Sequence, residues 1–213
     1  MGVLPRPYYS DALTTLYHGD CRDILPLLPP ADLLLTDPPY GMQFTGKAAV
    51  AANVKADGAR QGMRALRQAL FAVRLAPDAH AYSFCHWESW PDFYDAVSPY
   101  LPIKNALIWF KNRGGMGDTE MEYARDYEIV LYAAHPGRPL NGKRTGAVMR
   151  GFPPIPSTQR LHPTEKPVSL LKYLIGKSAP TGGLVLDPFA GSGSTLVAAR
   201  SLGRRSIGVE LDE

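Results

Sequence analysis

The chain has 213 residues, of which 45% are hydrophobic and 20% are charged, and its formal net charge is +3. This composition is typical of a globular protein and excludes a fibrous or a disordered chain. Two cysteines are too few for a disulfide scaffold, and no cysteines and histidines cluster at zinc spacing, so we expect no metal. We expect a single domain over residues 1–213 in the cytoplasm, and no membrane partner, because no apolar run approaches the ~18 residues of a membrane span.

Short apolar runs alternate with helical patterns along the chain. The first run, residues 32–36, predicts a buried strand that ends at the two prolines after Asp37. Apolar residues at helical spacing then predict a helix over residues 61–76. The later runs predict strands at 81–85, 106–110 and 128–132, a helix over 168–175, a strand at 184–186, a helix over 196–202 and a strand at 206–210. This alternation is typical of an α/β fold with a largely parallel sheet.

A compact set of polar and aromatic groups follows the first predicted strand. Asp37-Pro38-Pro39-Tyr40 stands at its carboxyl end, where open α/β sheets bind their ligands. The carboxylate of Asp37 and the carbonyl oxygen of Pro38 can each accept a hydrogen bond from an exocyclic amine, and Tyr40 can stack on a planar ring. A turn alone would explain the prolines but not the whole set, so the tetrapeptide indicates a site for a planar amine.

Two segments are basic and rich in glycine or proline. Residues 41–75 contain six basic residues and one acidic residue, and residues 135–164, which include Arg138, contain five basic residues and no acidic one. Basic loops favour a polyanion as partner, while the alternative is a solvated surface that happens to be basic. The candidate phosphate contacts are Lys47, Arg60, Lys143, Arg144 and Arg150.

A glycine-rich turn near the C-terminus has the context of a nucleoside-cofactor site. A predicted strand leads into Gly191-Ser192-Gly193, a helix follows, and Glu210 ends the next strand, 19 residues after Gly191. The glycines would let the backbone approach a ligand, and the acid would bind a ribose diol. A nicotinamide cofactor fits less well, because Leu196 replaces the third glycine of the dinucleotide motif. The unit also comes last in the chain, which indicates a circular permutation.

Three motifs together resemble a known family. Asp37-Pro38-Pro39-Tyr40, then His162-Pro163-Thr164-Glu165-Lys166-Pro167, then the segment from Asp187 to Thr195 resemble the S-adenosylmethionine-dependent amino-methyltransferases of DNA. Their order resembles the beta group, whose chain is circularly permuted. The resemblance implies a class I methyltransferase with a Rossmann-like, mostly parallel sheet and helices on both faces. It also implies S-adenosylmethionine as cofactor, double-stranded DNA as substrate, and a place in restriction-modification.

The resemblance also assigns roles to residues. Asp37, Pro38, Pro39 and Tyr40 would be the catalytic tetrapeptide, with Asp37 also beside the cofactor. Asp20 and Cys21 would meet the adenine of the cofactor, Glu210 its ribose, and Thr164 and Lys166 its methionine carboxylate. The methionine part would be wrapped by Asp187, Pro188, Phe189, Ala190, Gly191, Ser192 and Gly193. Trp109 to Asn112 and Tyr127-Glu128 match weaker motifs, for which we expect core packing.

The target base and the DNA-recognition region follow from the same resemblance. Asp37, where some members have serine, favours adenine N6, with cytosine N4 or an RNA adenine as alternatives. A non-catalytic nucleic-acid-binding module would explain the basic segments but not the motifs that contain Asp37 and Gly191. Recognition is expected in a short basic insertion at about residues 135–161. The sequence leaves open a homodimer, a partner nuclease, and whether the chain is a compact member or lacks the further helix usual after Glu210.

Overall fold

One sheet organises the chain. The computed structural model describes residues 3–38, 63–112, 120–121, 123–124, 126–159 and 165–211. Within these residues nine strands form a sheet of order β1-β2-β9-β8-β3-β4-β6-β5-β7. The strands are β1 (Tyr9–Ser10), β2 (Thr14–His18), β3 (Ala31–Thr36), β4 (Leu75–Cys85), β5 (Ile103–Phe110), β6 (Tyr127–Ala134), β7 (Val148–Met149), β8 (Leu184–Asp187) and β9 (Arg205–Glu210).

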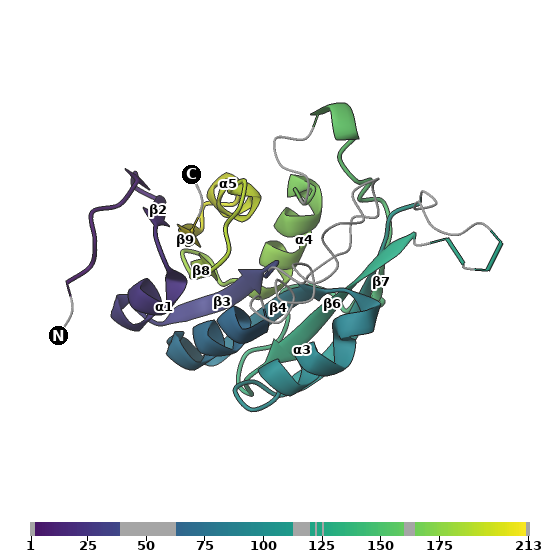
Figure 1. Cartoon of the computed structure of the whole chain (residues 1–213), viewed down its shortest axis with the longest axis horizontal. Helices are drawn as coiled ribbons and strands as arrows, with labels where there is room; N and C mark the ends of the chain where they lie inside the picture. The colour runs from purple at the N-terminus through teal and green to yellow at the C-terminus, as the bar shows by residue number, and fades with distance from the viewer. Residues whose placement is uncertain are drawn as a thin grey trace, which may run out of the picture.

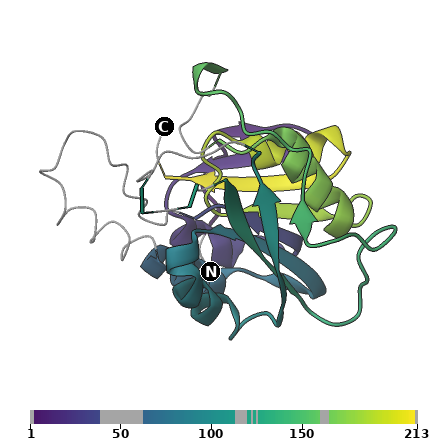
Figure 2. The same ribbon diagram turned by 90° about the vertical axis from the view of Figure 1, so that its right-hand side faces the viewer.

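Helices cover both faces of the sheet, as expected (Figure 1). The α-helices are α1 (Cys21–Ile24), α3 (Trp90–Val97), α4 (Val168–Ser178) and α5 (Ser194–Ser201), with a further helical segment at 63–72. Short 3₁₀ turns are η1 (Leu25–Leu27), η2 (Trp87–Ser89) and η3 (Ser157–Gln159). The side-on view in Figure 2 shows the yellow-green α4 and α5 on the face opposite the blue and teal helices. No helix in the described ranges is long and apolar enough to cross a membrane.

The buried core has two halves, one on each face, and the alternation of side chains along the strands explains them. On β3, Leu34 packs with α1, the helix of residues 63–72 and α3, whereas Leu33 and Leu35 pack with α4 and α5. On β8, Leu184 and Leu186 belong to the first half and Val185 to the second. Such strands are apolar throughout because both faces are covered, as the runs in the sequence indicate.

The sheet is mostly parallel, which confirms the expected fold class. Strands β2, β9, β8, β3 and β4 run parallel, while β6 is antiparallel to both β4 and β5. The carboxyl ends of β2, β9, β8, β3, β4 and β5 therefore lie at one edge, together with the amino end of β6. The chain leaves β3 toward β4 but leaves β8 toward β9, so the direction of winding reverses between β3 and β8. Ligands of open α/β sheets bind at such a reversal.

The predicted elements match the observed ones with local differences. The helix expected over residues 61–76 is described from residue 63, since 61 and 62 lie outside the described residues, and it ends at 72 because β4 begins at Leu75. Helix α3 was not predicted from the sequence, since its eight residues make little more than two turns and show too short a helical period. The two-residue strands β1 and β7 are too short to show a period of their own.

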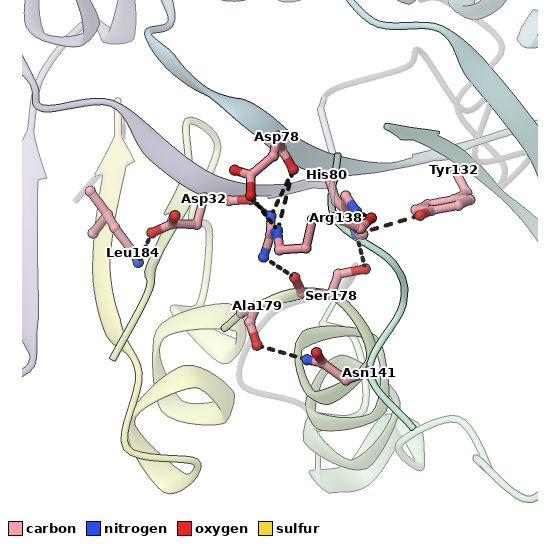
Figure 3. A network of polar contacts seen from close by, with 9 residues as sticks. All are labelled: Asp32, Asp78, His80, Tyr132, Arg138, Asn141, Ser178, Ala179 and Leu184. Carbon is pink, nitrogen blue, oxygen red and sulfur yellow. Dashed lines mark hydrogen bonds and ion pairs between the residues drawn. The ribbon is translucent and has the colours of Figure 1, made fainter. Parts of the chain in front are cut away.

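The opposite edge of the sheet is held by Arg138, which the sequence placed in a basic segment suited to a polyanion. Its guanidinium donates to the carbonyl oxygens of Ser178 at 2.5 Å, Asp32 at 2.6 Å and Asp78 at 3.2 Å (Figure 3). The ring of His80 contacts Ser178 Oγ at 3.0 Å in the same network. Arg138 lies in the loop after β6, and its hydrogen bonds join β3, β4 and the end of α4, so its guanidinium has a structural role.

Candidate active site

The carboxyl edge gathers most of the predicted site residues that the structure describes. Moving along the sheet, Asp20 follows β2, Glu210 ends β9, Asp187 ends β8, and Asp37 follows β3. Asp37 and Asp187 therefore flank the reversal of winding. Pro39, Tyr40, Lys47, Arg60 and Thr164 are predicted site residues that lie outside the described residues.

The glycine-rich turn between β8 and α5 leaves open space above it. Gly191 and Gly193 have φ values of +50° and +77°, in the left-handed region that favours glycine, and a Cβ on either would meet no atom within 4 Å. The amide of Ala190 donates to Val209 O at 2.9 Å, and that of Gly193 to Ala190 O at 2.8 Å. These bonds fix a turn whose glycines face room for a ligand.

Close packing beneath this turn depends on a different glycine. A Cβ on Gly208 of β9 would lie 2.8 Å from Leu196 Cδ1 and 3.0 Å from the Cβ of Ala190. In the dinucleotide motif the third glycine allows the helix to pack closely on the strand. In this chain Leu196 on α5 stands at the position of the third glycine. Close packing of the helix on the strand depends instead on Gly208 of β9.

Two carboxylates stand at the ends of the neighbouring strands β9 and β2. Glu210 accepts a hydrogen bond from the Gly191 amide at 2.6 Å, so the acid and the glycine-rich turn are in direct contact. Asp20 caps α1 by accepting from the Arg22 amide at 2.9 Å and is ion-paired with the Arg22 guanidinium. These hydrogen bonds from Arg22 hold the pKa of Asp20 below its usual value.

Asp187 lies at the base of the turn and is almost fully buried, with 2% of its surface exposed. Burial raises the pKa of this carboxyl to about 7, and the nearby Asp37 carboxylate adds to the rise. Hydrogen bonds from Thr195 and from the Phe189 amide act in the opposite direction. A cation beside Asp187 would favour its ionised form.

Asp37 is ion-paired with Lys166, which lies just before α4. The Lys166 ammonium contacts Asp37 Oδ2, lies 3.5 Å from Glu128 Oε2 and stands over the Phe84 ring at 5.0 Å from its centroid. Lys111 in turn binds Glu128 Oε1 at 2.5 Å. Glu128 and Lys111 come from segments expected only to pack the core, and they belong instead to the charged edge. The sequence signal was the pair of weak motifs that contain them.

The two cysteines have no setting for nucleophilic chemistry. Cys21 and Cys85 are both buried, and burial raises the thiol pKa to about 11 for Cys21 and about 12 for Cys85. A thiol with a raised pKa is a poor nucleophile at neutral pH. The described residues contain no group of three or more His, Cys, Asp or Glu side chains that could hold a metal ion.

The basic residues of the expected recognition segment lie at opposite edges of the sheet. Arg150 directly follows β7 and stacks on Phe110, with its Cζ atom 4.6 Å from the ring centroid, at the edge that carries Asp37. Lys143 instead accepts through its carbonyl oxygen from Lys177 Nζ at 2.5 Å, near the far end of α4. Of these two, only Arg150 lies at the edge that carries Asp37.

Comparison with known proteins decides the family. A family model for DNA methylases of the N6/N4 type matches residues 31–213. The chain belongs to the N6/N4 DNA methylase family. The methylase is 31% identical to YubD of Escherichia coli over 204 residues, which cover 94% of this chain and 86% of YubD. It is 25% identical to the DNA adenine methyltransferase YhdJ of Escherichia coli in an alignment 259 residues long, which covers 99% of this chain and 82% of YhdJ.

Solved structures share the fold of the methylase. The complex of M1.HpyAVI with S-adenosylmethionine has a TM-score of 0.69 at 22% identity, covering 94% of this chain and 95% of that one. The cytosine-N4-specific PvuII DNA methyltransferase has a TM-score of 0.75 at 15% identity, covering 97% of this chain and 84% of that one. The expected class I methyltransferase fold is confirmed.

Proposed function

We propose that this methylase is a site-specific enzyme that transfers a methyl group to N6 of adenine in duplex DNA at the carboxyl edge of its sheet. One observation carries the proposal. Asp37, at the end of β3, and the glycine-rich turn that begins at Asp187, at the end of β8, meet at the point where the winding of the sheet reverses. An acceptor for the substrate amine and a turn suited to a nucleoside cofactor thus lie next to each other.

S-adenosylmethionine is the cofactor of the methylase, as expected from the sequence: the chain belongs to a DNA methylase family, and a solved structure of this fold holds that molecule. The residues present fit it. Open space stands over Gly191 and Gly193, Asp187 offers a buried carboxylate for a cationic group, and Glu210 offers a carboxylate for the ribose diol. The bound cofactor supplies the methyl group, on a positively charged sulfur.

The residues of the chain would contribute mainly by positioning. Asp37 and the carbonyl oxygen of Pro38 would accept the two hydrogens of the adenine amine and so aim its lone pair at the methyl group. Positioning of this kind supplies roughly 7–11 kcal/mol of a reaction barrier. No covalent intermediate is needed, which agrees with the raised pKa values of both cysteine thiols.

The target base would be flipped out of the duplex to reach Asp37. Flipping costs about a few kcal/mol, and stacking on an aromatic ring returns roughly 1–3 kcal/mol per base. Tyr40 is our candidate for that ring, because it ends the same tetrapeptide.

Adenine is the proposed target because the tetrapeptide begins with Asp37 and because YhdJ, a relative over nearly the whole chain, is named as an adenine methyltransferase. The likeness in fold to PvuII makes cytosine N4 the second candidate. The test is transfer of labelled methyl from S-adenosylmethionine to unmethylated duplex DNA, followed by digestion to nucleosides. Label in N6-methyladenine is expected. Label in N4-methylcytosine would overturn the choice of base, and the absence of label would overturn the reaction.

A further inference from the structure

Four charged side chains form a continuous series along the carboxyl edge, in the order Asp37, Lys166, Glu128 and Lys111. They come from four separate segments. Asp37 directly follows β3, and Lys166 lies two residues before α4. Glu128 is near the start of β6, and Lys111 directly follows β5. Lys166 contacts both carboxylates, and Lys111 binds Glu128 Oε1 at 2.5 Å. Carboxylates and ammonium groups alternate, so each of the two inner groups has an opposite charge on either side.

Core packing alone does not account for this series. The Lys166 side chain is 8% exposed and that of Glu128 is 15% exposed. Taking such charges out of water is costly, and well-packed apolar side chains of similar size are often as stabilising or more so. Groups of this kind at the edge of a binding site point to a function.

The charge state of the two inner groups is well defined. The Lys166 and Lys111 ammonium groups hold the pKa of Glu128 below its usual value, against the effect of burial. The Asp37 and Glu128 carboxylates raise the pKa of Lys166, again against burial. Both groups therefore stay charged at neutral pH. Lys166 is shared between two acceptors, so a change at Glu128 alters how strongly Lys166 holds Asp37.

We propose that Lys166 and Glu128 are positioning residues that orient the Asp37 carboxylate, with Lys111 acting only through Glu128. The inference rests on the proposed role of Asp37 toward the substrate amine. Lys166 binds Oδ2 of Asp37, which fixes the rotation of the carboxylate and hence the direction in which it accepts a hydrogen bond. Glu128 attracts the same ammonium group from the other side and so limits how tightly Lys166 holds Asp37.

This role differs from the one that the sequence resemblance gave to Lys166, a contact with the methionine carboxylate of the cofactor. A contact with the cofactor would affect its binding. A positioning role would affect the rate of transfer and leave cofactor binding unchanged. The two roles are therefore separable by measurement.

The first test uses Glu128→Gln, which keeps the size and an acceptor atom but removes the charge. We expect kcat to fall about tenfold or more, with the dissociation constant of S-adenosylmethionine unchanged within about twofold. The variant Lys111→Met should have a similar effect. The double variant should be no slower than Glu128→Gln, because residues that act through one another are not additive. Lys104→Met, an exposed lysine at the other end of β5, is the matched control and should keep full activity.

Three results would overturn the proposal. Unchanged kcat in Glu128→Gln would mean that the series is only structural. Weaker cofactor binding with unchanged kcat would assign Lys166 to the cofactor. A double variant slower than either single variant by the product of their effects would show that Lys111 does not act through Glu128.

A second readout does not depend on activity. The carboxyl carbon of Asp37 can be observed by NMR in protein labelled at aspartate, and assigned by its absence in Asp37→Asn. We expect this resonance to shift in Glu128→Gln and to stay in place in Lys104→Met. If the wild-type protein transfers no methyl group, the proposed function fails, but this shift still tests the coupling. An unmoved resonance would overturn the positioning role.

Discussion

At the scale of single residues, Asp187 shows how burial changes the chemistry of a side chain. Its pKa is raised to about 7 mainly by loss of contact with water. The folded chain therefore binds a proton that the unfolded chain has released above about pH 4. The stability that this group contributes is present at low pH and is lost as the pH rises through about 7.

Asp187→Asn removes that titration and keeps the shape of the side chain. We expect the free energy of unfolding of the variant, relative to that of the wild type, to rise by about 1–2 kcal/mol between about pH 5.5 and about pH 8. Urea unfolding at both pH values measures this difference. A difference that does not depend on pH would contradict the raised pKa of Asp187.

The residue scale also shows what the sequence could not reveal. The proposed role of Asp37 as an acceptor at a strand end could be predicted from its neighbours in the chain, because the motif is contiguous. Its partner Lys166 lies 129 residues away in the sequence, and Glu128 is the second residue of β6, which runs antiparallel to β4. Only the order and register of the strands bring these charges together.

At the scale of elements, the sequence predicted most of the buried strands and helices because their apolar runs match the two covered faces of the sheet, but it predicted only residues 81–85 of β4. The sequence did not show that the two parts of the expected recognition segment, residues 135–161, lie at opposite edges of the sheet. Asn141 donates through its side-chain amide to Gly176 O at 3.0 Å, which attaches the first part of this segment to the far end of α4. Strand β7 pairs with β5 and carries the later part to the site edge.

This division predicts unequal contributions to DNA binding. Arg150→Ala should weaken duplex binding about tenfold and reduce the salt dependence of binding by about one phosphate contact. Lys143→Ala and Arg144→Ala should have effects within about twofold, because the loop before β7 is attached at the opposite edge. Fluorescence anisotropy with a labelled duplex at several salt concentrations compares the three variants. A larger loss in Lys143→Ala than in Arg150→Ala would place the DNA at the other edge.

At the scale of the whole molecule, the proposed roles divide the carboxyl edge of the sheet into two parts. The strands β2, β9 and β8 carry the groups suited to a nucleoside cofactor, and β6, β5 and β7 carry charged groups suited to the substrate side. Asp37 stands between them, directly after β3. The motifs predicted the cofactor half and Asp37 from the sequence, whereas Glu128 and Lys111 were expected to pack the core. The arrangement of all these groups along the edge depends on the strand order of the chain.

We propose that Asp37 serves methyl transfer and not cofactor binding. The most direct measurement compares Asp37→Ala with the wild type in two assays, calorimetric binding of S-adenosylmethionine and single-turnover transfer of labelled methyl to duplex DNA. Lys166 keeps Glu128 as a partner in this variant, so the fold should persist. We predict that transfer falls about 100-fold or more while the dissociation constant stays within about threefold. Transfer within about tenfold of the wild type, or a loss of cofactor binding that matches the loss of transfer, would contradict the account.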